Sequence, residues 1–232
     1  MMLKQWEQLP DYMKNSEVRP YWEALNRKKG QLAIKRGFDL CMALLLLILL
    51  AIPMVIISIL IKIDSKGPVF YRQERITING KHFKIHKFRT MVADAERQGT
   101  AVTVHNDERV TKIGKKLRRF RLDELPQIWD VIMGDMSFVG TRPEAVKYVE
   151  AYRPEYYATL LMPAGITSEA TIRYKDEEKL MDSAKNADEV YLNEILPQKM
   201  KWNLKSLQDF QIGNELLTMI RTILAVFGRN YN

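Results

Sequence analysis

Two adjacent acids, Asp123 and Glu124, stand in the stretch "RFRLDELPQIWDVIMGDMSFVGTRPE" directly after a dense run of cations, and Arg142 follows near its end. Acids favour the first turn of a helix because they meet the positive end of the helix dipole, and a proline such as Pro126 is tolerated there. The apolar residues that follow recur at helical spacing and predict one buried face: Leu125, Ile128, Trp129 and Ile132. A helix start therefore explains the acid pair without any chemical role, and a catalytic role needs further evidence.

The composition restricts the partners and the compartment. The chain of 232 residues is long enough for one domain with a sizeable core. Its formal net charge of +8 and its pI near 9.4 indicate a polyanionic partner, which could be nucleic acid, anionic lipid or a phosphorylated substrate. Cys41 is the single cysteine, so no disulfide can form within the chain.

A long apolar run from Leu40 to Ile61 contains no charged residue. As a straight helix rising about 1.5 Å per residue, it would reach about 33 Å, which is enough to cross a bilayer. The run starts too late, is too long and lacks a small-residue cleavage site, so it is not a cleavable signal peptide. It predicts a membrane helix.

Two features favour a re-entrant membrane helix over a straight span. Pro53 removes a backbone hydrogen bond and clashes with the preceding turn, which predicts a break there. Both flanks carry cations, Lys35 and Arg36 before the run and Lys62 and Lys66 after it, and positive flanks prefer the cytoplasmic side. A helix broken at Pro53 that enters and leaves by one face satisfies both observations. Prolines also occur in spanning helices, so the straight span stays open.

The chain divides into three predicted parts around this run. Residues 1–35 mix tryptophans and tyrosines with charges, which suits a segment at the headgroup level, and a loosely ordered tail is the competing interpretation. Residues 36–63 form the re-entrant membrane helix. Residues 64–232 form a mostly helical domain with interfacial amphipathic helices and a small β-hairpin that turns at Asn79-Gly80, where both positions need positive φ. The predicted fold class is α+β.

A helix start is also predicted near the second arginine of the opening stretch. The stretch "GDMSFVGTRPEAVKYVEAY" is predicted to begin with a turn and to continue with a capping box, in which Thr141 caps a helix and Glu144, three residues on, reaches back to it. A helix N-terminus presents free N–H groups, so with Arg142 in the first turn it would form a phosphate site. A plain helix cap without a ligand is the alternative.

The C-terminal third is predicted to be mainly helical. Beyond Pro163 the pattern indicates a loop with a short strand, then an acidic helix, and last a helix from about Ser206 to Phe227. One apolar stripe follows this last helix: Leu216, Leu217, Ile220, Ile223, Leu224 and Phe227. Such a stripe usually packs in a core, and in a membrane-bound protein it can instead lie on lipid.

These stretches, in this order, resemble the bacterial sugar transferase family, the monotopic polyprenyl-phosphate phosphoglycosyl transferases. The resemblance covers residues 34 to about 167 and rests on "KRGFDL", "GPVFYRQERI", "KFRTM", "TKIGKKLRRFRLDELPQIWDVIMGDMSFVGTRPE" and, more weakly, "PAGIT". It implies transfer of a sugar-1-phosphate from a UDP-sugar to undecaprenyl phosphate, with Mg²⁺ and a covalent phosphosugar on the Asp of the acid pair. It also implies a monotopic enzyme among the lipids of the bacterial inner membrane, with residues 64–232 as its catalytic domain on the cytoplasmic face.

The resemblance assigns roles to individual residues. Asp123 matches the nucleophile, and a carboxylate is ionised at neutral pH without the help of a base. Glu124 is expected to help Asp123 hold the metal or to activate the lipid phosphate. Repulsion between Asp123 and the diphosphate must be offset by Mg²⁺ and by cations. The expected phosphate-binding residues are Arg118, Arg142, Lys87 and Arg89.

Departures from the family pattern leave the sugar and the pathway unassigned. Thr141 stands where the family often has Pro, and the segment 168–178 lacks the usual family pattern. The chain resembles the short, minimal form of the family, and its oligomeric state stays open, with a homodimer as one candidate.

Two rival functions come from other classes. A membrane-tethered protein that binds nucleic acid or anionic lipid without catalysis would explain the net charge and the basic cluster between Val110 and Arg121. No nucleic-acid-binding motif accompanies that cluster, so no nucleic-acid partner is expected. A structural membrane adaptor would leave the acid pair and the arginines unexplained.

Overall fold

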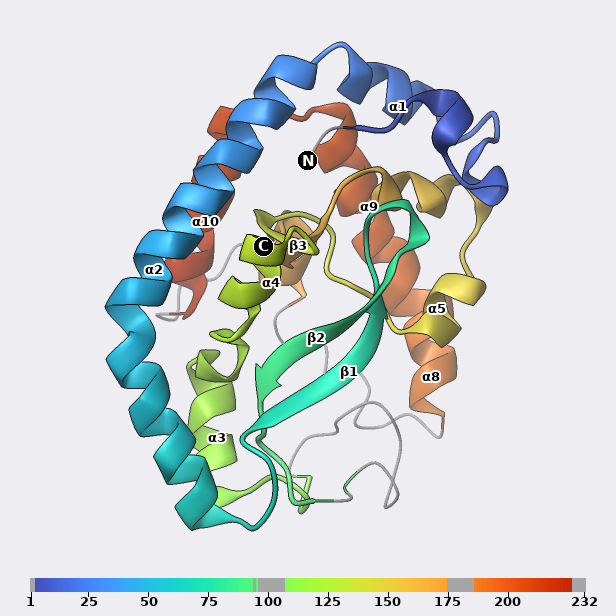
Figure 1. Ribbon diagram of the computed structural model, residues 1–232. Coiled ribbons are helices and arrows are strands. Elements are labelled where there is room, and N and C mark those ends of the chain that lie inside the picture. The colour runs from blue at the N-terminus through green and yellow to red at the C-terminus, as the bar shows by residue number, and fades with distance from the viewer. Residues whose placement is uncertain (1–2, 94, 96–106, 175–185, 227–232) are drawn as a thin grey trace.

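Helices dominate the chain, and two small sheets accompany them (Figure 1). The computed structural model describes residues 3–93, 95, 107–174 and 186–226. The α-helices are α1 (Arg19–Asn26), α2 (Lys29–Asp64), α3 (Lys112–Arg119), α4 (Gln127–Met133), α5 (Val146–Glu150), α6 (Glu169–Arg173), α8 (Ala187–Val190), α9 (Leu196–Gln208) and α10 (Ile212–Val226). The strands are β1 (Phe70–Ile76), β2 (His82–Phe88), β3 (Met136–Val139) and β4 (Ala164–Thr167). The mixed fold class expected from the sequence is confirmed.

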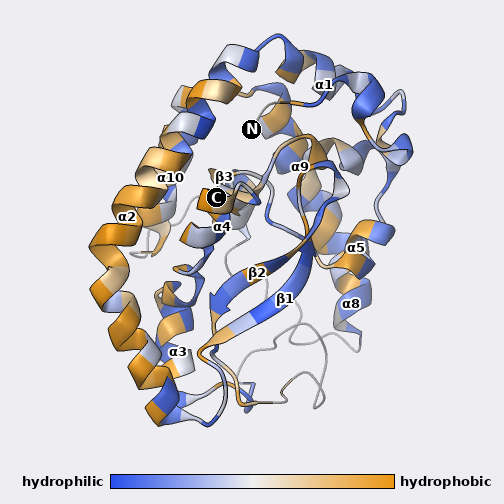
Figure 2. Ribbon diagram, in the orientation of Figure 1, coloured by the Kyte–Doolittle hydropathy of each residue, from blue (hydrophilic) through white to orange (hydrophobic). Residues whose placement is uncertain are grey.

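The predicted membrane helix is part of α2, which has 36 residues and runs along one side of the molecule (Figure 1). In the described part of the chain it is the one helix long and apolar enough to cross a membrane. Its apolar stretch is almost entirely exposed, and the ribbon of α2 in Figure 2 is coloured hydrophobic along most of its length. The helix continues through Pro53. A break at this residue is therefore not shown, and the re-entrant course in a membrane stays a prediction.

Both ends of α2 dock on the remainder of the protein. Near its start, Arg36 donates to the carbonyls of Val131 (2.7 Å) and Ile132 (3.0 Å) at the C-terminal end of α4. Near its end, two buried isoleucines, Ile57 and Ile61, belong to one apolar cluster with Phe88 of β2 and Leu117 of α3. A helix held at both ends lies along the domain rather than projecting from it. Its exposed apolar outer face is then available for contact with membrane lipid.

The hairpin forms where the Asn-Gly signal predicts it. Strands β1 and β2 pair antiparallel, with Phe70 opposite Phe88 and Ile76 opposite His82. Asn79 has φ of 54° and Gly80 φ of 73°, which are the positive values that such a two-residue turn requires. This prediction is confirmed.

A second small sheet, which the sequence did not predict, lies just before Thr141. Residues Met136–Val139 form β3, which is buried throughout and pairs parallel with β4. The backbones cross closely just after β3, because a Cβ on Gly165 would lie 2.2 Å from the backbone nitrogen of Gly140. The turn expected at the start of this stretch lies at Gly134, whose φ is 87°. Strand β3 after it was not predicted, and the one short strand expected after Pro163 is its partner.

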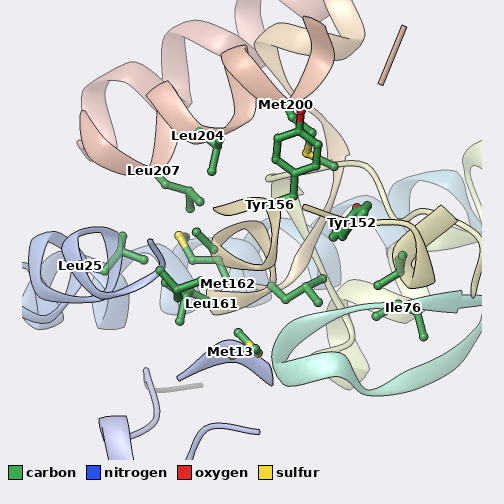
Figure 3. Packing of buried hydrophobic residues seen from close by; sticks show 14 of the residues in the cluster. Met13, Leu25, Ile76, Tyr152, Tyr156, Leu161, Met162, Met200, Leu204 and Leu207 are labelled. Carbon is green, nitrogen blue, oxygen red and sulfur yellow. The ribbon is translucent and has the colours of Figure 1, made fainter. Parts of the chain in front are cut away.

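The N-terminal segment packs into the largest hydrophobic core. Met13 and Leu25 are fully buried and lie in one cluster with Leu161 of the 3₁₀ segment Pro154–Leu161 and Met200 of α9 (Figure 3). The interpretation of residues 1–35 as a loosely ordered tail is therefore wrong for residues 3–35. Contact of this segment with a membrane surface stays a prediction.

The C-terminal helix is shorter than predicted. The chain forms two helices, α9 and α10, with a break at residues 209–211, so the last helix begins at Ile212 instead of Ser206. The apolar stripe on α10 is exposed rather than packed: Leu216, Leu217, Ile220, Ile223 and Leu224. An ion pair between Lys35 and Glu215 holds α10 beside α2. Phe227 and most of the expected acidic helix lie outside the described residues.

Cysteine labelling can test on which side of the membrane the two ends of α2 lie. In a Cys41→Ser background, Glu17→Cys and Lys66→Cys place single thiols at exposed positions before and after α2. Because both ends dock on one domain, a membrane-impermeant maleimide added to intact cells should label neither, and it should label both after lysis. Labelling at position 17 alone in intact cells would establish a spanning helix.

Candidate active site

The acid pair lies on a tight helical turn that leads into α4. Asp123 and Glu124 end the 3₁₀ segment Leu122–Glu124, which follows Arg121 in the left-handed region with φ of 56°. The acids therefore precede α4, close to the predicted helix start. Ile128 is buried as expected, whereas Trp129 is 47% exposed and does not belong to the buried face.

Glu124 is a buried carboxylate held among cations. Its Oε1 lies 2.6 Å from Nη2 of Arg142 and 3.3 Å from Nζ of Lys87, and Arg121 approaches to 3.9 Å. Burial acts to raise the pKa of Glu124, but Arg142 and Lys87 outweigh it and hold the pKa well below its usual value. Glu124 is therefore an ionised anchor for the cations of the site.

Asp123 is buried to a similar degree as Glu124 but forms fewer hydrogen bonds and ion pairs among the described residues. Its Oδ1 has no hydrogen-bond partner among the described residues. Burial and the charge of Glu124 raise the pKa of Asp123, and Lys87 and Arg118 oppose that rise. Ionised Asp123 is thus less favourable than a carboxylate in water, which amends the simple expectation from the sequence. A cation bound at this oxygen would restore the charged form.

Lys87 completes the polar centre of the site. It lies near the end of β2 and reaches Glu124 across the gap between hairpin and turn. Burial lowers the pKa of Lys87 to about 8, opposed by Glu124 and reinforced by Arg142. Its positive charge near neutral pH thus depends on the neighbouring carboxylate.

The acid pair fits a magnesium ion bound mainly by substrate oxygens. Among the described residues, no three His, Cys, Asp or Glu side chains gather into a metal cluster. Mg²⁺ commonly takes one or two carboxylates and completes its shell with substrate phosphates and water. The free Oδ1 of Asp123 suits this arrangement, whereas both Glu124 oxygens already face Arg142.

Three of the four expected phosphate-binding residues lie near the acid pair, and Arg89 does not. Arg142 and Lys87 meet at Glu124. Arg118 donates to Thr90 Oγ1 at 2.9 Å and acts on Asp123 through its charge. Arg89 is turned elsewhere, although the sequence placed it beside Lys87 in the site.

Arg89 caps the end of the membrane helix. Its guanidinium donates to the Ser65 carbonyl at 2.6 Å, the Ser65 hydroxyl at 2.9 Å and the Lys66 carbonyl at 2.8 Å. Residues 87 and 89 would share a face only in a continuing strand, and β2 ends at Phe88. The geometry therefore gives Arg89 a structural contact with the end of α2, and its contact with a substrate stays a prediction.

The segment Thr141–Ala145 is not helical and has no regular secondary structure. The next helix, α5, begins at Val146, so the predicted capping box is absent and no helix N-terminus supports Arg142. Glu144 points into the protein, where its Oε1 accepts from the Tyr191 hydroxyl at 2.6 Å and lies 3.7 Å from Lys199 Nζ. This prediction was wrong because a distant partner uses the acid expected to cap.

The sequence analysis missed three polar residues on the hairpin. The register places Tyr71 opposite Lys87, and alternation puts Gln73 and Arg75 on the same face as Tyr71. Their partly buried positions alternate with exposed neighbours along β1. The two-residue period and the turn at Asn79-Gly80 together fix this register, and they could have identified the row from the sequence.

Comparison with known proteins decides the family. A family model described as bacterial sugar transferase matches residues 30–229. The chain belongs to the bacterial sugar transferase family. The acid pair, Lys87 and Arg142 all lie inside the matched range.

Relatives in the family differ in sugar and in length. The chain is 46% identical over 125 residues to a putative undecaprenyl-phosphate N-acetylgalactosaminyl 1-phosphate transferase of Bacillus subtilis, covering 53% of this chain and 69% of that protein. It is 33% identical over 201 residues to the UDP-N-acetylgalactosamine-undecaprenyl-phosphate N-acetylgalactosaminephosphotransferase of Aeromonas hydrophila, covering 84% and 44%. It is 43% identical over 120 residues to the UDP-glucose:undecaprenyl-phosphate glucose-1-phosphate transferase of Escherichia coli, covering 52% and 26%. The match thus spans less than half of two of these three proteins.

The contacts of Arg89 predict a loss of stability on substitution. Arg89→Met keeps most of the side-chain stem and removes the donors to Ser65 and Lys66, which should cost about 1.5–3 kcal/mol. For a chain of this size that is a fall of roughly 3–12 °C in Tm, measured in detergent. Arg72→Met on the exposed face of β1 is the matched control and should change Tm little. An unchanged Tm for Arg89→Met would contradict the capping role.

Proposed function

We propose that the chain transfers a sugar-1-phosphate from a UDP-sugar to undecaprenyl phosphate and releases UMP. This would be the first membrane step in the assembly of a bacterial glycan. The observation that carries the proposal is the asymmetry of the acid pair: Glu124 is engaged by Arg142 and Lys87, and Asp123 keeps an oxygen without a partner among the described residues. One carboxylate is fixed and the other is free to react. The relatives' names support the substrate classes.

The proposed reaction has two displacements at one phosphorus atom. In the first, an Asp123 oxygen attacks the β-phosphorus of the UDP-sugar, the bond from that phosphorus to the bridging oxygen breaks, and UMP leaves with the bond's electrons. In the second, a phosphate oxygen of undecaprenyl phosphate attacks the same phosphorus, and the bond to Asp123 breaks. The lipid then carries the sugar through a diphosphate, and Asp123 is again a carboxylate.

The charges around Asp123 support such a nucleophile. Its attack on a diphosphate requires positive charge close to the phosphate oxygens. Arg142, Lys87 and Arg118 supply that charge from three separate segments of the chain. Mg²⁺ held by Asp123 and substrate oxygens, with Glu124 nearby, would add charge neutralisation and orientation.

The exposed apolar surface supports a lipid acceptor. The outer face of α2 and the stripe on α10 leave many large apolar side chains exposed. The Lys35–Glu215 ion pair joins the two helices, and both are largely hydrophobic in Figure 2. A surface of this kind marks a membrane-contacting region. Because both ends of α2 dock on one domain, we place the enzyme as a monotopic protein on the cytoplasmic face, where nucleotide sugars are available. Membrane lipids would then cover α2 and α10.

A two-step reaction predicts UMP release without the lipid acceptor. Enzyme, UDP-sugar and Mg²⁺ alone should release at most about one equivalent of UMP per active site, because the adduct blocks a second turnover. Intact-mass measurement should show the added sugar phosphate, and fragmentation should place it on Asp123.

Two variants separate the roles in the acid pair. Asp123→Asn removes the nucleophile at nearly constant size and should abolish the adduct and turnover. Glu124→Gln leaves the nucleophile in place and removes the anchor of Arg142 and Lys87, so it should slow turnover strongly and still form some adduct. Unmodified Asp123 during fast turnover would instead support direct attack by the lipid phosphate with both substrates bound.

The fork of Arg142 is the basis of a separate prediction. Its two terminal nitrogens lie 2.6 and 3.5 Å from Glu124 oxygens, so a planar guanidinium can face this carboxylate and a phosphate in one orientation. Arg142→Lys keeps the charge and loses the fork, so kcat/KM for the UDP-sugar should fall roughly 10- to 100-fold. Activity equal to that of the parent would reject the role of the fork.

A further inference from the structure

Arg75 is a partly buried cation on the hairpin, one residue before the end of β1. Its side chain lies on the face shared with Gln73 and, through the strand register, with Lys87. One guanidinium nitrogen donates to Oε1 of Gln73, and another lies 3.4 Å from the carbonyl oxygen of Pro143. Both acceptors are neutral, so these contacts position the guanidinium without balancing its charge.

No carboxylate of the described residues forms an ion pair with Arg75. The acid that acts on it most is Glu144, which is already engaged by the Tyr191 hydroxyl and by Lys199. The other charged groups nearby are cations: Arg142 acts on Arg75, and Arg75 acts on Lys87. Glu124 already forms ion pairs with Arg142, Lys87 and Arg121.

This excess of positive charge is costly in the ligand-free protein. Burial lowers the pKa of Arg75, Glu144 opposes that effect and Arg142 reinforces it. A cation removed from water beside other cations is stabilised only when an anion arrives. A diphosphate supplies such an anion, and guanidinium forks match phosphate oxygens in two parallel hydrogen bonds.

We propose that Arg75 binds the diphosphate of the nucleotide-sugar donor, on the hairpin side of the site, together with Arg142 and Lys87. The inference rests on the proposed function, because it takes the donor to be a nucleoside diphosphate sugar. It adds a substrate-binding residue from β1. The donor brings two linked phosphate groups to a centre where Glu124 neutralises only part of the positive charge.

The test compares Arg75→Gln with Arg72→Gln. Arg72 lies on the same strand, three residues away and on the exposed face, so its loss removes the same formal charge outside the site. UDP with Mg²⁺ serves as the probe, and its affinity is read from the rise in Tm with UDP concentration. Arg75→Gln should weaken UDP binding about 10- to 100-fold and raise KM for the UDP-sugar to a similar extent. Arg72→Gln should leave both near the parental values.

Stability distinguishes binding from a structural role. Without UDP, Arg75→Gln should keep or raise Tm, since it removes a poorly compensated cation. If Arg75 instead serves to hold the loop at Pro143, the variant should lower Tm and leave UDP affinity unchanged, and that result would overturn the proposal. Equal losses of UDP affinity in Arg72→Gln and Arg75→Gln would also overturn it, because they would reflect general electrostatics.

Measuring the two reaction steps separately distinguishes donor binding from acceptor binding. Arg75→Gln should slow adduct formation from the UDP-sugar alone and leave unchanged the rate at which preformed adduct reacts with undecaprenyl phosphate. Slowing of only the second step would assign Arg75 to the acceptor and reject the donor role. A parent protein that binds UDP and transfers no sugar phosphate would defeat the proposed function while leaving the Arg75–diphosphate contact supported.

Discussion

The buried carboxylate of Glu124 is the interaction on which the site depends. A charge in such a place is tolerated only when it is paired, and the partners here come from separate segments, Lys87 from β2 and Arg142 from the loop after β3. The pairing therefore draws the hairpin, the acid turn and that loop together. It also separates two adjacent acids chemically, since Glu124 takes the cations and Asp123 keeps an oxygen without a partner among the described residues.

The membrane helix is docked on the same elements that carry the site. Arg36 binds carbonyls at the end of α4, which follows the acid pair, and Lys35 donates to the carbonyl of Val139 at 3.0 Å, three residues before Arg142. Asp39, one turn further, accepts from the Ser137 hydroxyl at 2.8 Å. The depth of α2 in a membrane would thus fix the height of Asp123 above the lipid surface. In the proposed reaction, a lipid phosphate at headgroup level would need such a fixed distance to reach the phosphosugar on Asp123.

Local signals predicted local structure, and distant contacts decided the remainder. The hairpin was predictable because Asn79 and Gly80 meet the need for positive φ by themselves. Strand β3 was not, since its four residues pair with a strand far along the chain. Likewise, Glu144 fits a capping box in sequence, but the Tyr191 hydroxyl engages it in the fold. Arg89 could not be placed without knowing that β2 ends one residue earlier.

The ion pair between Lys35 and Glu215 bears on whether the apolar stripe of α10 packs in the core or stays exposed. An apolar stripe on a C-terminal helix fits a core as well as a lipid surface, and the pattern on α10 does not distinguish them. Both charges are largely buried between α2 and α10. A shift of α10 along α2 would deprive Glu215 of this ion pair, whereas Lys35 would keep Asp39 and the carbonyl of Val139. The register fixed by this pair leaves the stripe of α10 exposed beside the exposed face of α2. Two segments from opposite ends of the chain thereby carry exposed apolar faces on either side of a buried ion pair.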